Sequence, residues 1–148
     1  MTTESQTDTN APAHPFEKGL EIYENKGDLK ESIELFEQGV LMNPRDSTGY
    51  TCLAWLHLLR NEEGDATKGV NYASKAVRLD RSNQQAHFNL VLAMLVVGRS
   101  GVRKEFDAAK MKCHTQEEMT EIIENLQDAV VRRPDYSEAS KLLNWLGA

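Results

Sequence analysis

The sequence predicts an all-α fold made of repeated helical hairpins, and three observations lead to this prediction. Apolar residues recur at spacings of three and four, as in the run from Leu29 to Val40, and therefore share one helical face. The pattern of small and apolar residues at positions 36, 39 and 40 returns after 37 residues and again after a further 53. Glycine turn signals recur 37 and 34 residues apart, at Gly27, Gly64 and Gly98.

Residues 26–45 show the repeating unit most clearly. Gly27 and Asp28 indicate a turn, because glycine tolerates the backbone angles that end a helix and aspartate can cap the next one. Gly39 leaves room for a neighbouring helix to approach closely, and Pro44 marks the end of the helix. A preceding helix is expected at about residues 15–25, so these segments form one helical hairpin.

A period close to 34 residues, with helix, turn, helix and a closing proline, resembles the tetratricopeptide repeat (TPR). The resemblance implies an α-solenoid of three hairpins, at about residues 13–46, 47–83 and 84–136. A final helix at residues 137–146 is expected to cap the open end of the solenoid.

The third hairpin departs from the TPR pattern, because 19 more residues than the repeat allows follow Gly98. Within this insert, residues 99–116, apolar side chains at helical spacing predict an extra short helix. The second helix of the hairpin is then expected from about residue 115 to 132, where Thr115 and Glu118 have the spacing of a capping box.

Composition limits the functions that the chain can have. Residues 1–14 are rich in small polar residues and are expected to be a disordered tail ahead of a domain at 15–148. The net charge of −6 argues against general affinity for nucleic acid. No apolar run approaches the roughly 20 residues of a membrane span, and no secretory signal is visible. Two distant cysteines are expected to stay reduced, which favours a cytoplasmic location.

The TPR resemblance implies that the first helix of each hairpin lines a concave groove. On this chain the first repeat then supplies an acidic wall and the next two an apolar floor, which is typical of an interaction surface. The alternative is that the large apolar side chains are buried in the protein's own core. The expected partner-binding residues are Glu17, Glu21, Thr51, Trp55, Leu58, Leu59, Gln85, Phe88, Asn89, Leu92 and Lys141.

The insert carries a local excess of positive charge in an otherwise acidic chain. Arg99, Arg103 and Lys104 begin this basic segment, and Lys110 and Lys112 follow. Such a patch can bind an acidic protein, an anionic membrane surface or RNA. The alternative is a solvated amphipathic helix that packs Phe106 on the rest of the domain.

These patterns predict a non-enzymatic protein–protein interaction module that acts as an adaptor, scaffold or co-chaperone-like protein. It would bind a partner segment in the concave groove. The alternatives are a structural protein that self-associates through the same face, with a homodimer as one form, and RNA or anionic-surface binding through the insert. No catalytic residue, cofactor or metal is expected, because the cysteines and histidines lack zinc-site spacing and nucleophile motifs are missing.

Overall fold

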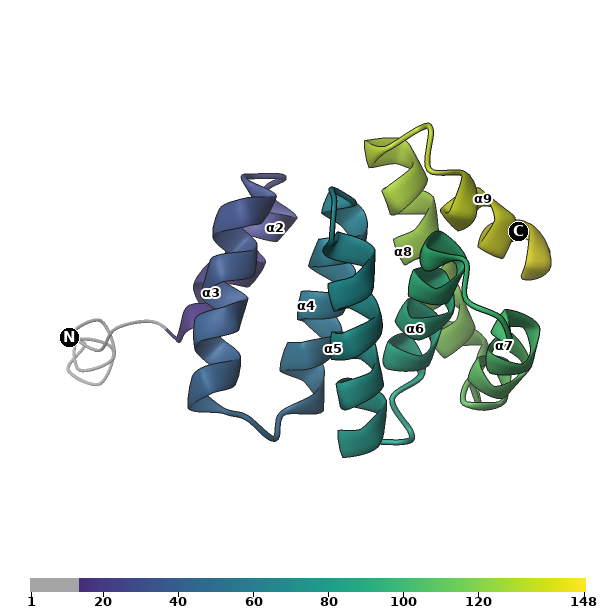
Figure 1. Cartoon of the computed structure of the whole chain (residues 1–148), viewed down its shortest axis with the longest axis horizontal. Helices are drawn as coiled ribbons and strands as arrows, with labels where there is room; N and C mark the ends of the chain where they lie inside the picture. The colour runs from purple at the N-terminus through teal and green to yellow at the C-terminus, as the bar shows by residue number, and fades with distance from the viewer. Residues whose placement is uncertain (1–13) are drawn as a thin grey trace. The chain divides into compact units, whose positions relative to one another are not determined.

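The computed structural model describes residues 14–148, and all of its regular elements are α-helices (Figure 1). The all-α class predicted from the sequence is confirmed. The expected tail, residues 1–14, lies outside the described residues except for His14. The helices are α2 (Pro15–Glu24), α3 (Leu29–Met42), α4 (Ser47–Arg60), α5 (Asp65–Leu79), α6 (Gln84–Val97), α7 (Val102–Met111), α8 (Gln116–Arg132) and α9 (Ser137–Trp145).

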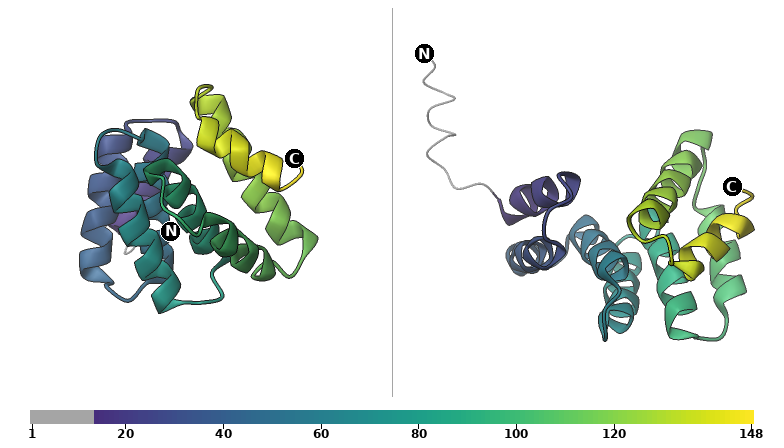
Figure 2. Two further views of the ribbon diagram at one scale, coloured as in Figure 1. Left: turned by 45° about the vertical axis from the view of Figure 1, so that its right-hand side comes forward. Right: turned by 90° about the horizontal axis from the view of Figure 1, so that it is seen from above.

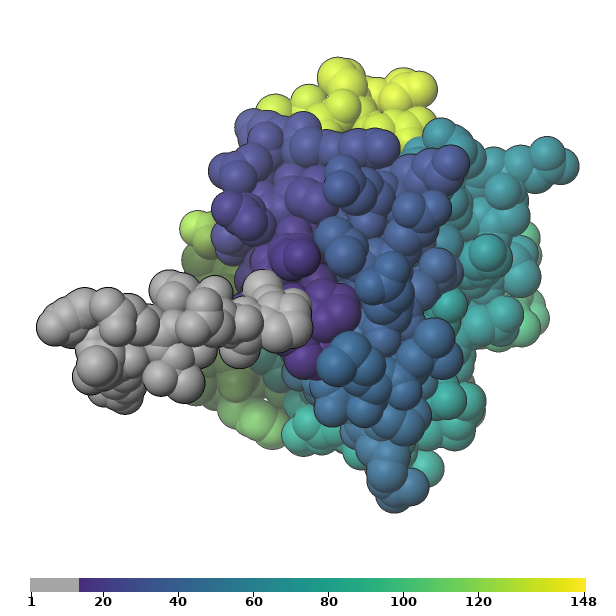
Figure 3. All heavy atoms as spheres, turned by 90° about the vertical axis from the view of Figure 1, so that its left-hand side faces the viewer, coloured from purple at the N-terminus to yellow at the C-terminus, as the bar shows by residue number. Residues whose placement is uncertain are grey.

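The chain divides into two compact units, residues 1–44 and residues 45–148. The described part of the first unit is the α2–α3 hairpin, whose outer side chains are seen in purple and blue in Figure 3. The Nδ1 atom of His14 accepts a hydrogen bond from the backbone of Phe16 at 3.1 Å and caps α2. Asp28 caps α3 as expected, with Lys30 N 3.0 Å from its carboxylate.

Two glycines allow α2 and α3 to pack closely. Gly39 lies directly against the Phe16 ring, and Gly19 lies against Phe36. The two rings stack with centroids 5.2 Å apart, and the Ser32 hydroxyl donates to the Gly19 carbonyl at 2.8 Å. The close approach expected at Gly39 is therefore confirmed, and its partner is an aromatic ring.

Replacing Gly39 with alanine is expected to destabilise the first unit. An added Cβ would overlap the Phe16 ring, so the helices must move apart. We expect a loss of about 1–3 kcal/mol in unfolding free energy, after a gain in helix propensity of up to about 1 kcal/mol. Denaturant unfolding measures this loss. The neighbouring exposed residue serves as a control, and Gln38→Ala should change stability by less than about 0.5 kcal/mol. An unchanged midpoint for Gly39→Ala would contradict the packing.

The second unit contains α4 to α9, and several sequence signals define its helix ends. Asp46 caps α4 and Asn83 caps α6, each accepting a backbone hydrogen bond from the first turn. Thr115 and Glu118 form the predicted capping box of α8. The extra helix expected within the insert is present as α7. Among residues 14–148, no helix has both the length and the apolar character needed to cross a bilayer.

The pairing of the last four helices differs from the expectation. The segment at about 115–132 was expected to pair with α6. Of the helices that follow α6, however, it is α7 that packs most extensively against it, while α8 packs against α9. The physical reason is the short α6–α7 connection, in which Gly98 and Gly101 adopt left-handed φ angles of 75° and 84°. This tight turn brings α7 directly back onto α6, where Phe106 becomes fully buried. Helices α8 and α9 therefore form a hairpin of their own, which we call the C-terminal hairpin (Figure 2).

Candidate partner-binding site

A chain of side-chain amides connects α4, α6 and α8. The Asn89 side chain donates to the Thr51 carbonyl at 3.1 Å, and Gln85 donates to the Asn89 side-chain oxygen at 2.8 Å. Asn125 of α8 then donates to the Gln85 side-chain oxygen at 2.9 Å. Three residues expected to bind a partner, Thr51, Gln85 and Asn89, are thus brought together, and one of them, Gln85, binds the protein's own helix α8. We call this set of contacts the amide chain.

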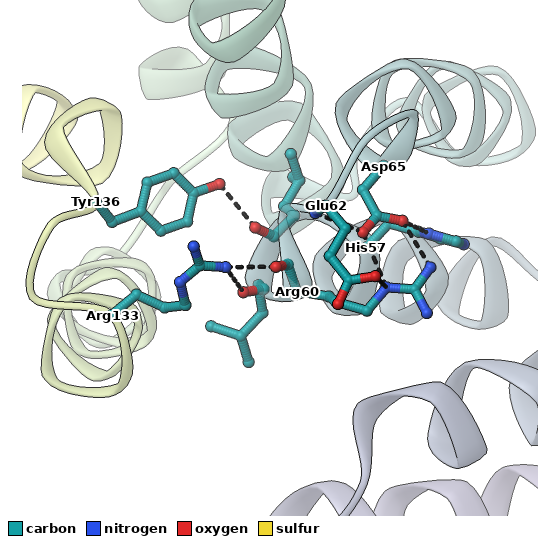
Figure 4. A network of polar contacts seen from close by, with 8 residues as sticks. His57, Arg60, Glu62, Asp65, Arg133 and Tyr136 are labelled. Carbon is teal, nitrogen blue, oxygen red and sulfur yellow. Dashed lines mark hydrogen bonds and ion pairs between the residues drawn. The ribbon is translucent and has the colours of Figure 1, made fainter.

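The connection between α8 and α9 is attached to the end of α4. One guanidinium nitrogen of Arg133 donates to the carbonyls of Leu59, at 3.1 Å, and of Arg60. The Tyr136 hydroxyl donates to the Leu58 carbonyl at 2.8 Å (Figure 4). The last carbonyls of a helix have no partner within the helix, so these donors satisfy groups that would otherwise need water. Burial, with the charge of Glu138, raises the pKa of Tyr136 far above its ordinary value, so the hydroxyl remains a donor.

The C-terminal hairpin therefore lies across the face formed by α4 and α6. Its Asn125 contacts the beginning of α6, and its Arg133 contacts the end of α4. This is the face that the TPR resemblance assigns to a partner. We call it the α4–α6 face.

The large apolar residues expected to floor an open groove are buried. Phe88 packs its ring edge-to-face on Phe106 of α7, with centroids 6.3 Å apart, so it lies between α6 and α7. The Leu58 side chain lies against Gly69 of α5, within the second hairpin. The exposed fraction is at most 8% for all five residues, which are Trp55, Leu58, Leu59, Phe88 and Leu92. In this conformation these side chains are therefore buried in the protein's own core, which is the alternative that the sequence left open.

The charged residues expected to take part are not members of the amide chain. Glu17 and Glu21 are exposed on α2, in the first unit. Lys141 is exposed on α9, with its ammonium 5.7 Å from the centre of the Trp145 ring. The basic residues of the insert are exposed at the α6–α7 turn and on α7, at Arg99, Arg103 and Lys104.

Sequence reasoning did not identify the residues that attach the C-terminal hairpin. Asn125, Arg133 and Tyr136 follow no motif, and their roles depend on the pairing of α8 with α9. No local pattern distinguishes Asn125 from the other uncharged polar residues of α8, which are Gln116, Thr120 and Gln127.

A buried ionic cluster fixes the turn that follows α4 (Figure 4). Asp65 is 2% exposed and accepts hydrogen bonds from Arg60 at 2.8 and 2.9 Å and from His57 Nδ1 at 2.7 Å. It also accepts from the Glu62 backbone at 2.8 Å. Burial alone would raise the pKa of Asp65, but these bonds and the charge of Arg60 hold that pKa well below its usual value. The charged carboxylate thereby positions the end of α4, where the C-terminal hairpin attaches.

The two thiols show no sign of chemical activation. Burial, followed by the charge of Asp46, raises the pKa of Cys52 to about 11. Burial and the nearby Glu118 also raise the pKa of Cys113. Both side chains are therefore protonated at neutral pH, whereas a nucleophilic cysteine must be a thiolate. Within residues 14–148, no group of three or more His, Cys, Asp or Glu side chains is placed to hold a metal.

Comparison with solved structures agrees with this architecture. The chain is similar to the TPR domain of Arabidopsis OM64, with a TM-score of 0.52 and 17% sequence identity. The match covers 89% of this chain and 90% of that domain. No protein-family model matches the sequence, and no curated protein matches it either. The likeness shows the fold, so the predicted α-solenoid of TPR type is confirmed as a fold.

Proposed function

We propose that this protein is a non-enzymatic protein–protein interaction module that binds a helical partner segment on the α4–α6 face. The TPR-type fold supports the general class. The observation that carries the proposal is the amide chain, in which this face already holds a helix through Gln85 and Asn125. In the free protein the resident helix is α8, and a partner takes its place.

The contacts of α8 favour a helix that can be replaced. Its fully buried side chains are few, namely Ile122, Leu126 and Ala129. The hydrogen bonds that attach the C-terminal hairpin to α4 and α6 end on one side-chain amide and three main-chain carbonyls, which accept from any suitable donor. A net hydrogen bond contributes only about 0.5–1.5 kcal/mol, and the packing of Trp145 on Phe106 adds to the attachment. We infer that this hairpin opens at a lower free energy than the whole unit unfolds.

When the hairpin leaves, the exposed α4–α6 face would present the Gln85 side chain and the free carbonyls of Leu58 and Leu59. In the first unit, Glu17 and Glu21 are both exposed, and we propose that they contact a basic segment of a partner. We propose that such binding serves an adaptor, scaffold or co-chaperone-like role and that the protein acts in the cytoplasm.

Affinity capture with matched variants tests this proposal. The double variant Arg133→Ala, Tyr136→Phe removes the donors to the end of α4 and should increase the yield of a specific partner severalfold, because the hairpin opens more often. Adding Gln85→Ala to it should remove that gain. A double variant with substitutions at exposed α5 positions, Lys68→Ala and Arg78→Ala, serves as the control.

Two outcomes contradict the proposal. One is that the double variant Arg133→Ala, Tyr136→Phe captures no more partner than the wild type, although faster proteolysis between α7 and α8 shows that its hairpin is attached more loosely. The other is a mass that rises with concentration in sedimentation of the purified loosened variant, because the exposed face would then bind a second copy.

A further inference from the structure

A second surface, separate from the α4–α6 face, gathers cations around two aromatic rings on α7 and α9. The Arg103 guanidinium lies 4.4 Å from the centre of the Trp145 ring and 5.4 Å from that of Phe106. The ammonium of Lys110 lies 5.3 Å from the Phe106 ring, and Lys141 lies near Trp145. The two rings meet edge-to-face with centroids 5.3 Å apart. We call this surface, made by Arg103, Lys110, Lys141, Phe106 and Trp145, the cationic patch.

The three cations are exposed and form no ion pair with a carboxylate within residues 14–148. Asp107 lies one turn beyond Arg103 on α7, but the Arg103 guanidinium is turned toward Trp145 instead. The other carboxylate of α7, Glu105, faces His87 at 3.8 Å. The positive charge of the cationic patch is therefore not neutralised by the chain itself.

We propose that the cationic patch binds an acidic helical segment of another protein. Arg103 and Lys110 lie seven residues apart on one face of α7, which corresponds to about 10 Å along the helix axis. Two carboxylates seven residues apart on a partner helix have the same separation. Stacking on Trp145 also restrains the Arg103 guanidinium, so less conformational entropy is lost when a carboxylate binds its free edge.

The same geometry disfavours single-stranded nucleic acid as the occupant. Proteins of that class stack bases on exposed aromatic faces. Here Arg103 and Lys141 lie over Trp145, and Phe106 is 1% exposed, so neither ring is open to a base. The chain also carries a net charge of −6, which repels a long polyanion once it extends beyond the cationic patch.

Fluorescence anisotropy with a labelled synthetic helix tests the proposal. The probe carries glutamates at positions seven residues apart on one face, and its twin carries glutamines there. At low salt we expect the glutamate probe to bind and the glutamine twin to bind at least about tenfold more weakly. The double variant Arg103→Gln, Lys110→Gln should lose about five- to tenfold in affinity for the glutamate probe.

Two further variants separate the cationic patch from overall charge. Lys68→Gln with Arg78→Gln makes the same change in net charge on α5 and should alter affinity less than about twofold. Asp107→Asn should strengthen binding, because it removes a negative charge beside Arg103. Thermal unfolding verifies that each variant is folded. If Arg103→Gln destabilises the protein, Arg103→Lys takes its place in the test, and it should retain most of the affinity because it keeps the charge.

The proposal is overturned if the glutamate probe fails to bind at low salt, or if the α5 control variant loses as much affinity as the patch variant. It is also overturned if a labelled oligouridylate or phosphatidylserine vesicles bind more tightly than the probe and lose that binding in the patch variant. Concentration-dependent self-association through the cationic patch, seen by sedimentation without the probe, would likewise overturn it.

Discussion

Replacing Asp65 with alanine is expected to lower the free energy of unfolding by about 3–5 kcal/mol, a value typical for breaking a buried ion pair. The substitution removes the acceptor of hydrogen bonds from His57, Arg60 and the Glu62 backbone. The buried His57 ring would then have no partner at either nitrogen, since its Nε2 already lacks one. Denaturant unfolding of the purified protein measures the loss.

Glu63 offers a matched control for Asp65, because it is an exposed carboxylate in the same turn. Glu63→Ala should change stability by no more than about 0.5 kcal/mol. Equal effects of the two substitutions would contradict the assignment of Asp65 as the centre of the turn.

The ionic cluster also predicts a dependence of stability on pH. Because the folded pKa of Asp65 is lowered, the unfolded state binds a proton in a range where the folded state does not. The stabilisation by Asp65 is therefore complete above the unfolded pKa, near 3.9, and is lost as pH falls from there toward the folded pKa. Asp65→Asn lacks this group. The stability difference between it and the wild type should be constant at neutral pH and shrink below about pH 4.

Replacing Phe88 with alanine is expected to cost about 3–5 kcal/mol of unfolding free energy. Its ring is 2% exposed and contacts Phe106, so truncation leaves a cavity between α6 and α7. Denaturant unfolding again gives the value. The result also decides between a core residue and a groove residue, because a groove residue could be truncated with little loss of stability.

Met111, on the same pair of helices, is the control for Phe88. Its exposed fraction is 77%, so Met111→Ala should change stability by no more than about 0.5 kcal/mol. A small effect of Phe88→Ala, close to that of Met111→Ala, would mean that the Phe88 ring is available to a partner after all.

Local sequence signals predicted the helices well, because caps and turns depend on few residues. Asp28, Thr115 with Glu118, and the apolar spacing of α7 each correspond to a feature of the structure. Helix pairing was harder to predict, since the 34-residue period suggested that the insert was an interruption. The glycines at 98 and 101 instead make α7 the partner of α6.

The arrangement of the candidate site residues could be predicted only in part, for a reason of the same kind. Thr51, Gln85 and Asn89 do face one another, because their positions in α4 and α6 follow from the repeat. Whether a neighbouring apolar side chain is open or buried depends on how the later helices pack, and the repeat pattern does not define that packing. Phe88 is buried by α7, and the α4–α6 face is covered by a hairpin whose attachment through Arg133 and Tyr136 leaves no periodic pattern.

Native-state hydrogen exchange of the full chain tests most directly whether the C-terminal hairpin leaves the α4–α6 face without unfolding of the whole unit. We expect amides of α8 and α9 to exchange through an opening with a lower free energy, and a weaker denaturant dependence, than amides of α4 and α6. The double variant Arg133→Ala, Tyr136→Phe should lower the opening free energy of α8 and α9 further and leave the rest of the second unit little changed. If all these helices exchange with one common free energy and one denaturant dependence, the hairpin is a fixed part of the core and cannot give way to a partner.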